Sequence, residues 1–362
     1  MGNESGSAPA RGTACATAGL LGVTLVWGGS FVLTKDALAD LPAADLMFER
    51  FALATAVLFA LRPRALRGLG RTGWRHGVLI GLILAFSCLT QTYGLRTTAA
   101  SVSAFITGLF VVFTPALGAL VLRTRIAAAA WAGAAIATVG LGLLTLNIPG
   151  SGLIGTGELL TLVCAVGWAA HITAVGAWAE QHDPYALAVV QLATTAAVCL
   201  LVMLPAALGR GAMVLPSRGQ DWLTLGYTAL LCTAAAFFVQ TFAQRRISAT
   251  RAAVVMTMEP VFGALAARLS GEHLPARGYF GAALVLAAMY LVELRRDPAN
   301  QPRETLDADP DLLWCRGNQY SSTPYASTQY AATQHLSTQY SSTLGLRAVA
   351  STHGSDARGA EP

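Results

Sequence analysis

Long apolar segments alternate with short polar connections along most of the chain. Ten such segments can be read, at 18–37, 44–61, 77–94, 101–122, 128–146, 154–177, 186–208, 222–242, 252–269 and 277–294. A helix that crosses a membrane needs roughly 20 apolar residues, and these segments have about that length. The pattern therefore predicts an all-α integral membrane protein with about ten transmembrane helices.

The second half of the chain repeats the pattern of the first. Gln91 and the segment around Pro115 recur as Gln240 and the segment around Pro260, in the same order and at similar spacing. The copies meet near residues 149–152, where the sequence reads Pro-Gly-Ser-Gly. We expect a first repeat of five helices at 18–148 and a second at 154–294, and such repeats are typical of membrane transporters.

The basic residues predict how the chain crosses the membrane. Arg62, Arg64, Arg67, Arg71 and Arg75 share one loop, and most other basic residues between spans fall on the same side if the spans number ten. By the positive-inside rule this side is cytoplasmic, so both termini, including the segment 1–17, are expected in the cytoplasm. With five spans in each half, the second repeat begins on the opposite side from the first, which makes the two repeats inverted.

Composition narrows the class of protein. Hydrophobic residues make up 54% of the chain and charged residues only 12%, against roughly a quarter charged in a soluble domain, and the mean hydropathy is +0.53. An ordinary soluble fold is excluded, and the lipid bilayer of the plasma membrane is the expected partner. The net charge of +5 follows from the basic loops, so no nucleic-acid partner is expected. A homodimer is left open.

Motifs of enzymes and pumps are missing from the sequence. It contains no His-Glu-x-x-His pair, no Gly-x-Ser-x-Gly segment and no Walker-type phosphate loop, which are the signatures of metalloproteases, hydrolases and ATP-driven pumps. No group of residues has the spacing of metal ligands. We therefore expect no enzymatic activity, no metal and no cofactor.

Composition changes after about residue 296. Residues 297–310 are acidic and contain proline, and five pentads ending in threonine follow between 319 and 343. Such a segment buries too little apolar surface to offset its ordering entropy, so 297–362 is predicted to be a disordered cytoplasmic tail. A docking or phosphorylation tail and a tandem expansion without a role are both left open.

Several short segments recur in order in the two halves. They are Trp27-Gly28-Gly29-Ser30-Phe31, Glu49-Arg50-Phe51, Gln91-Thr92-Tyr93-Gly94-Leu95 and Phe113-Thr114-Pro115 in the first copy, and Trp168, Gln191, Gln240, Met258-Glu259-Pro260 and Gly271-Glu272 in the second. Together they resemble the EamA-like drug/metabolite transporters over roughly 20–294. The resemblance implies a carrier of two inverted five-helix repeats that moves small metabolites by alternating access, often as an exporter driven by protons or a counter-substrate.

Arg50 is the first candidate for binding a substrate. A charge within a membrane span is costly and normally faces a partner or a water-filled cavity, and a guanidinium binds a carboxylate or phosphate through paired hydrogen bonds. Its counterpart in the second repeat is Gln191. The alternative is that Glu49 and Arg50 lie near the end of the span, where Arg50 reaches to water or the two residues pair.

Glutamines mark a polar face in both repeats. Gln91 lies on a polar stripe of the third span, close to Tyr93, and Gln240 lies on a stripe of the eighth span with Thr233. A polar stripe on an apolar helix faces a cavity or another helix. Gln91, Tyr93, Gln191 and Gln240 are therefore candidates for lining a substrate site, and hydrogen bonding between helices is the alternative.

Aromatic residues recur at matching positions of the first and sixth spans. Trp27, Ser30 and Phe31 share one helical face, and Trp168 and His171 repeat that spacing. An indole within the membrane can stack on an apolar or cationic substrate, so all five are candidates for the substrate site. Packing of the protein interior is the alternative.

Three residues are candidates for coupling transport to protons: His171, Glu49 and Glu259. Histidine titrates near neutral pH. Glu259 directly precedes a proline, which permits a kink, and a carboxyl at such a break can bind and release a proton. The alternatives are a buried histidine that only forms hydrogen bonds, and an ion pair of Glu259 with Arg268 or Arg251.

These observations predict a secondary transporter, and more narrowly an exporter, that moves small metabolites or drug-like compounds across the cytoplasmic membrane. The alternative is a membrane scaffold or sensor that acts through the tail. The substrate, the direction of transport and the coupling ion are left open by the sequence.

Overall fold

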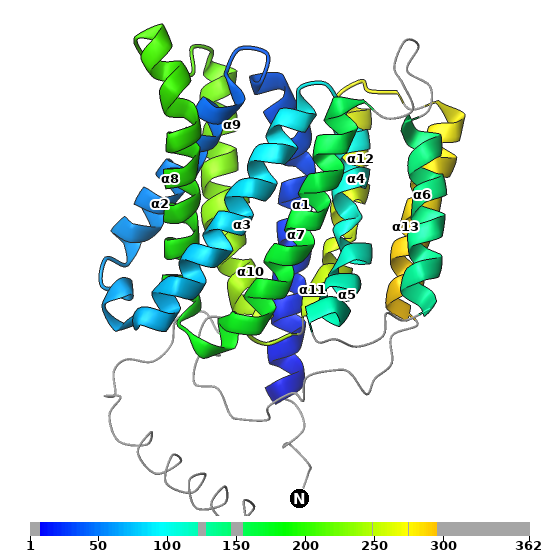
Figure 1. The fold of residues 1–362 in the computed structure, drawn as a ribbon, viewed down its shortest axis with the longest axis horizontal. Helices are drawn as coiled ribbons and strands as arrows, with labels where there is room; N and C mark the ends of the chain where they lie inside the picture. The colour runs from blue at the N-terminus through cyan, green and yellow to red at the C-terminus, as the bar shows by residue number, and fades with distance from the viewer. Residues whose placement is uncertain (1–7, 122–127, 146–154, 248, 274, 295–362) are drawn as a thin grey trace, which may run out of the picture. The chain divides into compact units, whose positions relative to one another are not determined.

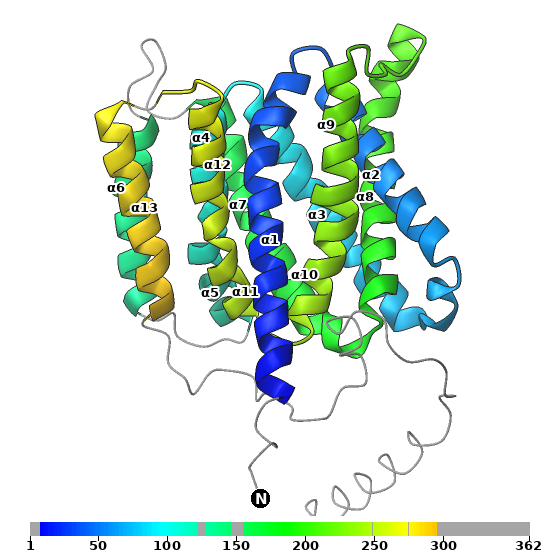
Figure 2. The same cartoon turned by 180° about the vertical axis from the view of Figure 1, so that it is seen from behind.

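The computed structural model describes residues 8–121, 128–145, 155–247, 249–273 and 275–294. Within these ranges every regular element is a helix, and Figure 1 and Figure 2 show the bundle from opposite sides. The all-α prediction is confirmed for the described residues. The predicted tail at 297–362 lies outside them.

Six helices and one short turn make up the first half of the bundle. They are α1 (Ala8–Ala37), α2 (Ala43–Leu61), the 3-10 helix η1 (Ala65–Gly68), α3 (Arg71–Leu95), α4 (Ala100–Gly108), α5 (Phe110–Val121) and α6 (Ala128–Thr145).

The second half is similar, with a 3-10 turn after its first helix and a π-helical segment between its third and fourth α-helices. It comprises α7 (Thr156–Trp178), the 3-10 helix η2 (Ala179–Gln181), α8 (Pro184–Arg210), α9 (Gly219–Ala229), the π-helix η3 (Leu230–Ala235), α10 (Ala236–Gln244), α11 (Ala249–Met256), α12 (Met258–Leu269) and α13 (Ala276–Leu294).

Three of the segments predicted as single helices are interrupted. The segment 101–122 is divided at Leu109, the segment 252–269 at Thr257, and the segment 222–242 passes through η3. The prolines do not stand at the divisions: Pro115 lies inside α5, and Pro260 is in the first turn of α12, where its missing N–H is tolerated. Gly108 at the end of α4 packs against Pro260, so the two divided helices meet near their breaks.

Six helical stretches among the described residues are long and apolar enough to cross a membrane. They are Ala14–Ala37, Arg71–Leu95, Ala100–Gly118, Thr156–Gln181, Pro184–Arg210 and Gly219–Gln244. Shorter apolar helices lie at Trp131–Gly140 and Ala276–Leu291. The chain is therefore a multi-pass membrane protein.

The helices pack with a pair at each edge of the bundle. α6 runs along α13 at one edge and α2 runs along α8 at the other, with α1, α3 and α7 between them. α3 contacts both α7 and α8, and α1 contacts both α10 and α12. Large apolar side chains such as Leu25, Phe86 and Leu201 are exposed on the surface of the bundle, as expected for helices that face lipid.

α1 and α12 approach closely because glycine occupies the crossing on both helices. A Cβ added to Gly28 of α1 would lie 2.7 Å from the backbone nitrogen of Gly263 and 2.6 Å from the Cβ of Phe262. Small residues let helix backbones approach in this way. The crossing joins a helix of the first half to a helix of the second, so it fixes how the two halves meet.

Replacing Gly28 by alanine should destabilise the bundle. We expect Gly28→Ala to lower the free energy of unfolding by roughly 1–3 kcal/mol, because the backbone of α12 must move to admit the methyl group. Gly22→Ala on the same helix is the control, since a Cβ there meets nothing within 4 Å. Thermal unfolding in detergent measures both. Equal melting temperatures for the two variants would contradict the close crossing.

Candidate functional site

A narrow cavity lies where the two halves of the bundle meet. α1, α2 and α3 line it from the first half, and α7, α10 and α12 line it from the second. The lining residues are Trp27, Ser30, Phe31, Thr34, Arg50, Cys88, Gln91, Thr92, Leu95, Trp168, Phe237 and Glu259. The cavity volume is about 30 Å³, room for two or three water molecules at ~10–15 Å³ each. In this conformation the space between the two halves is too small for a metabolite.

The cavity collects most of the residues predicted to bind substrate. Those that line it are Trp27, Ser30, Phe31, Arg50, Gln91 and Trp168. Glu259, predicted for proton coupling, lines the cavity as well. The other predicted residues, which do not line it, are Glu49, Tyr93, His171, Gln191 and Gln240.

Helical periodicity holds a signal for three lining residues that the prediction missed. Thr34 lies two turns after Trp27 on the same face of α1, and Cys88 and Leu95 lie about one turn before and after Gln91 on α3. Residues at such spacings share one side of a helix. The prediction named single conspicuous residues and did not follow their helical faces further along the chain, so these neighbours were passed over.

Three aromatic rings form one wall of the cavity. The ring centroids of Trp27 and Trp168 are 5.3 Å apart, and both indoles contact Phe237, at 5.5 Å from Trp27 and 6.0 Å from Trp168. The Trp168 and Phe237 rings are nearly parallel, with 7° between their planes. Contacts of this geometry stabilise an aromatic cluster, and the faces turned to the cavity present an apolar surface to a solute.

The guanidinium of Arg50 is held by a threonine from the other half of the chain. Arg50 Nε donates to Thr233 Oγ1 at 2.6 Å. The single proton of that hydroxyl goes to the backbone oxygen of Thr228 at 2.8 Å, so the oxygen turns its lone pairs to Arg50. Among the described residues no carboxylate pairs with Arg50, which leaves its terminal nitrogens for a ligand.

The π-helix η3 supplies both this threonine and a partner for Trp27. Thr233 lies within η3 and bonds a carbonyl five residues back, whereas a threonine in an α-helix reaches three or four residues back. Trp27 Nε1 donates to the backbone oxygen of Cys232, also in η3, at 2.7 Å. One irregular segment of the second half therefore orients two cavity residues of the first half.

Glu259 faces the cavity as an unpaired carboxyl group. Its side chain is 6% exposed, and no residue that the structure describes forms a hydrogen bond or an ion pair with it. Arg268, one of the two partners considered from the sequence, is exposed, and the side chain of Arg251 lies outside the described residues. Gln91 is held differently, since its Nε2 donates to Thr107 Oγ1 at 3.1 Å.

Three of the predicted residues take part in buried hydrogen bonds away from the cavity. His171 Nε2 and Gln191 Oε1 are 3.0 Å apart, and Gln191 Nε2 donates to Thr241 Oγ1 at 3.1 Å. Gln240 Nε2 donates to Gln244 Oε1 at 3.0 Å. The contacts of His171 and Gln191 join α7, α8 and α10, as the alternative of hydrogen bonding between helices describes, whereas the Gln240–Gln244 bond lies within α10.

Tyr93 and Glu49 lie apart from both groups. Tyr93 is 37% exposed and does not line the cavity. Glu49 is buried on α2, and neither of its carboxyl oxygens has a hydrogen-bond partner among the described residues. Their transport roles stay predictions.

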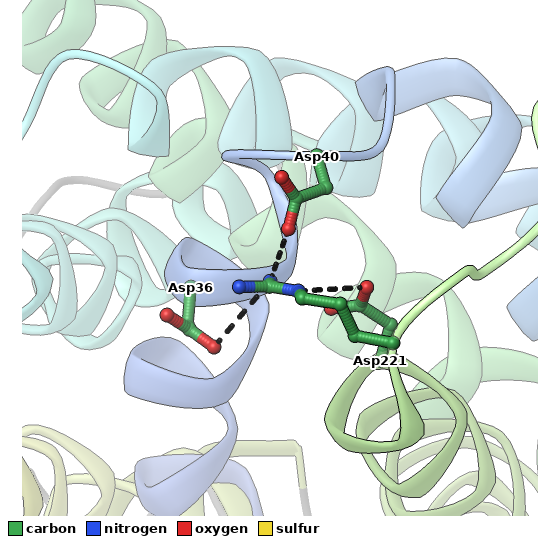
Figure 3. A network of polar contacts seen from close by, with 4 residues as sticks. Asp36, Asp40 and Asp221 are labelled. Carbon is green, nitrogen blue, oxygen red and sulfur yellow. Dashed lines mark hydrogen bonds and ion pairs between the residues drawn. The ribbon is translucent and has the colours of Figure 1, made fainter.

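A cluster of charges ties the two halves together at the end of the bundle where α1 ends. Arg218, at the start of α9, lies 2.5 Å from Asp40, 2.8 Å from Asp221 and 3.8 Å from Asp36, and Figure 3 shows the three carboxylates turned toward its guanidinium. Hydrogen bonds to Asp221, together with the nearby charges of Asp40 and Asp36, raise the pKa of Arg218. Because α1 and α9 belong to different halves, this network must break if the halves separate at this end.

The sequence profile of the EamA-like transporter family matches the chain twice, at residues 16–146 and 155–294. The chain belongs to this family. The family named from the short motifs is thereby confirmed, and the matched regions contain every residue that lines the cavity. Membership in a transporter family indicates a transporter and not an enzyme.

Relatives of this EamA-like transporter include proteins named as transporters. An uncharacterized transporter of Archaeoglobus fulgidus is 28% identical over 300 residues, covering 76% of this chain and 85% of the relative. A probable amino-acid metabolite efflux pump of Salmonella typhimurium is 29% identical over 286 residues, covering 74% of this chain and 91% of the relative. A solved crystal structure with 20% identity covers 78% of this chain and 97% of its own, with a TM-score of 0.57, which shows a shared fold.

Removing the Gln191 amide should destabilise the bundle through His171. Gln191→Leu leaves His171 Nε2 buried without its partner, and we expect the free energy of unfolding to fall by about 1–3 kcal/mol. The double variant His171→Leu/Gln191→Leu should recover part of the loss, because no ring nitrogen is then left without its partner and Thr241 keeps its bond to the backbone oxygen of Phe237. Thermal unfolding in detergent measures these changes, with Gln181→Leu at an exposed site as the control. The coupling would be contradicted if the double variant lost at least as much free energy of unfolding as the two single variants lose together.

Proposed function

We propose that this EamA-like transporter is a secondary carrier that exports small metabolites or drug-like compounds across the cytoplasmic membrane by alternating access. The observation that carries the proposal is the narrow cavity built from three helices of each half. A site between two halves can be opened to one side and then the other by rocking them against each other. The efflux function named for the Salmonella relative supports export.

Inverted repeats are supported by helix contacts that occur in matching pairs. α1 of the first half packs on α10 and α12 of the second, and α7 of the second half packs on α3 and α5 of the first. α1 and α7 also run in opposite directions through the bundle in Figure 1. Counting α4 with α5, α9 with α10 and α11 with α12, we propose ten spans in two inverted repeats, at 18–148 and 154–294.

The orientation in the membrane follows from the arginine-rich loop. The segment 62–75 lies at the end of the bundle from which α1 begins, and it carries Arg62, Arg64, Arg67, Arg71 and Arg75. By the positive-inside rule we place this end in the cytoplasm. Both termini are then cytoplasmic, and the Arg218 network closes the outer end.

Arg50 and the aromatic wall define the class of substrate that we propose. The terminal nitrogens of a guanidinium can take a carboxylate or phosphate oxygen through paired hydrogen bonds. Trp27, Trp168 and Phe237 offer an apolar surface next to it. The site therefore suits a small metabolite that carries an anionic group and an apolar body.

Glu259 is the residue that we propose to couple transport to protons. An unpaired carboxylate is costly to bury, so closure of the cavity around Glu259 favours its protonated form. Opening toward water allows the proton to leave. Glu259 and Arg50 lie on helices of different halves and line the same cavity, so binding of solute and release of the proton affect the same closed space.

Transport by the full-length protein in liposomes tests this proposal. We expect a pH gradient to drive accumulation of anionic solutes from an isotope-labelled metabolite mixture, measured by mass spectrometry of the liposome contents. Arg50→Ala should lower uptake at least about tenfold, because a charge-assisted hydrogen bond contributes ~1.5–3 kcal/mol. Glu259→Gln should abolish the effect of the pH gradient while solute exchange across the membrane continues.

Exposed residues of the same types provide the controls. Arg96→Ala and Glu180→Gln remove the same groups from exposed positions away from the cavity and should leave transport unchanged. Gradient-driven uptake by Glu259→Gln at the wild-type rate would contradict its role in coupling. Unchanged uptake by Arg50→Ala would contradict the substrate site.

A further inference from the structure

A second and larger cavity lies at the end of the bundle from which α1 begins. It lies between η1, which follows α2, and the η2 turn that leads into α8. Its volume is about 350 Å³, and it is lined by Arg62, Arg64, Ala65, Gly68, Leu69, Gln181, His182 and Asp183. None of these residues lines the central cavity, and the transport mechanism uses none of them.

The lining of this cavity is basic. Two guanidinium groups, Arg62 and Arg64, face one carboxylate, Asp183. That carboxylate is already engaged: its Oδ1 accepts the backbone N–H of Ala186 at 2.8 Å, capping α8, and its Oδ2 lies 3.7 Å from Arg62. Arg64 forms no ion pair with any described residue. The cavity therefore has positive charge available for an anion.

One lining residue, His182, is held in place by ring contacts behind it. His76 Nδ1 and His182 Nε2 are 2.9 Å apart, and the His76 ring stacks on Trp178 with centroids 4.4 Å apart and 9° between the planes. Arg62 also lies over the ring of Tyr185 at 5.6 Å. These contacts fix the positions of His182 and Arg62, so the cavity has a defined shape.

Exposed apolar side chains lie close in the sequence to the arginines of the cavity, on the elements before and after η1. Phe59 and Leu61 at the end of α2 are exposed, and so is Trp74 near the start of α3. Tryptophan is enriched at the boundary between lipid tails and headgroups. The arginines of the cavity therefore lie close to the level of the lipid phosphates, and basic pockets beside transmembrane helices bind acidic headgroups.

We propose that this cavity binds a phosphate group through Arg62 and Arg64, carried by the headgroup of an acidic phospholipid whose tails lie against the apolar surface of α2. Inorganic phosphate shares the same chemistry and is the other source of the anion. Arginine suits either ligand because its planar group donates paired hydrogen bonds to phosphate oxygens.

Thermal unfolding of the full-length protein in detergent tests the site. Dioctanoyl phosphatidylglycerol, dioctanoyl phosphatidylcholine and inorganic phosphate are titrated separately, since a ligand that binds the folded state raises the melting temperature. We expect phosphatidylglycerol to raise it with saturation and phosphatidylcholine to have no such effect. Arg62→Gln/Arg64→Gln should raise the lipid concentration needed for half-saturation by about 25-fold, at about fivefold per arginine near an acidic surface.

A matched variant separates this site from general attraction between opposite charges. Arg67→Gln/Arg71→Gln removes the same charge from the same segment at exposed positions that do not line the cavity. The lipid concentration at half-saturation should therefore stay at the wild-type value. Equal weakening by both pairs of substitutions would overturn the proposal. So would equal stabilisation by the two lipids.

Gly68→Leu tests the cavity without changing any charge. Gly68 lines the cavity, and a Cβ there meets nothing within 4 Å, so there is room for a leucine side chain at the cavity wall, where it should weaken phosphatidylglycerol binding. Arg64→Gln alone provides a further variant that breaks no ion pair with a described residue. Wild-type binding by both variants would overturn the proposal. If only inorganic phosphate raised the melting temperature with saturation, and if Gly68→Leu abolished this effect, the cavity would be a phosphate site. Its assignment to a lipid headgroup would then be overturned.

Discussion

A charged guanidinium inside a membrane protein needs a hydrogen-bond partner whenever no substrate is bound. The arrangement of the central cavity depends on which partner Arg50 has. Its partner is a neutral hydroxyl, that of Thr233, so the charge of Arg50 stays uncompensated. A carboxylate in the same place would neutralise it and compete with an anionic solute. The hydroxyl accepts from Arg50 with a lone pair, while its own proton is donated to the backbone oxygen of Thr228 within the π-helix η3.

The same π-helix explains why the site exists only when the two halves are together. Cys232 and Thr233 of the second half hold Trp27 and Arg50 of the first, and the close crossing of α1 and α12 at Gly28 keeps these helices at a fixed separation. π-helical turns are rare and are often found at functional sites. Separation of the halves would therefore change the hydrogen bonds of the binding residues at the same time as it opens the cavity.

The positions of the helices can be predicted well from the sequence, whereas the residues of the site can be predicted only in part. Apolar length predicts where helices lie, and the recurrence of Trp27 as Trp168 brings both indoles to one cavity. Gln240 matches Gln91 of the first repeat, and His171 stands at the position that corresponds to Ser30. Both nevertheless form hydrogen bonds within the second half and do not line the cavity. Which side of a helix faces the cavity depends on small rotations between neighbours, and the π-turn that turns Thr233 toward Arg50 leaves no periodic signal in the sequence.

The most direct test of this account is a kinetic measurement on Thr233, with a solute shown to be transported by the protein in liposomes. We expect Thr233→Val to raise KM about tenfold or more with little change in the maximal rate, because Arg50 loses a charge-assisted hydrogen bond contributing ~1.5–3 kcal/mol. Thr233→Ser keeps the hydroxyl and should restore the wild-type KM. A wild-type KM for Thr233→Val, or a serine variant as impaired as the valine variant, would contradict the account.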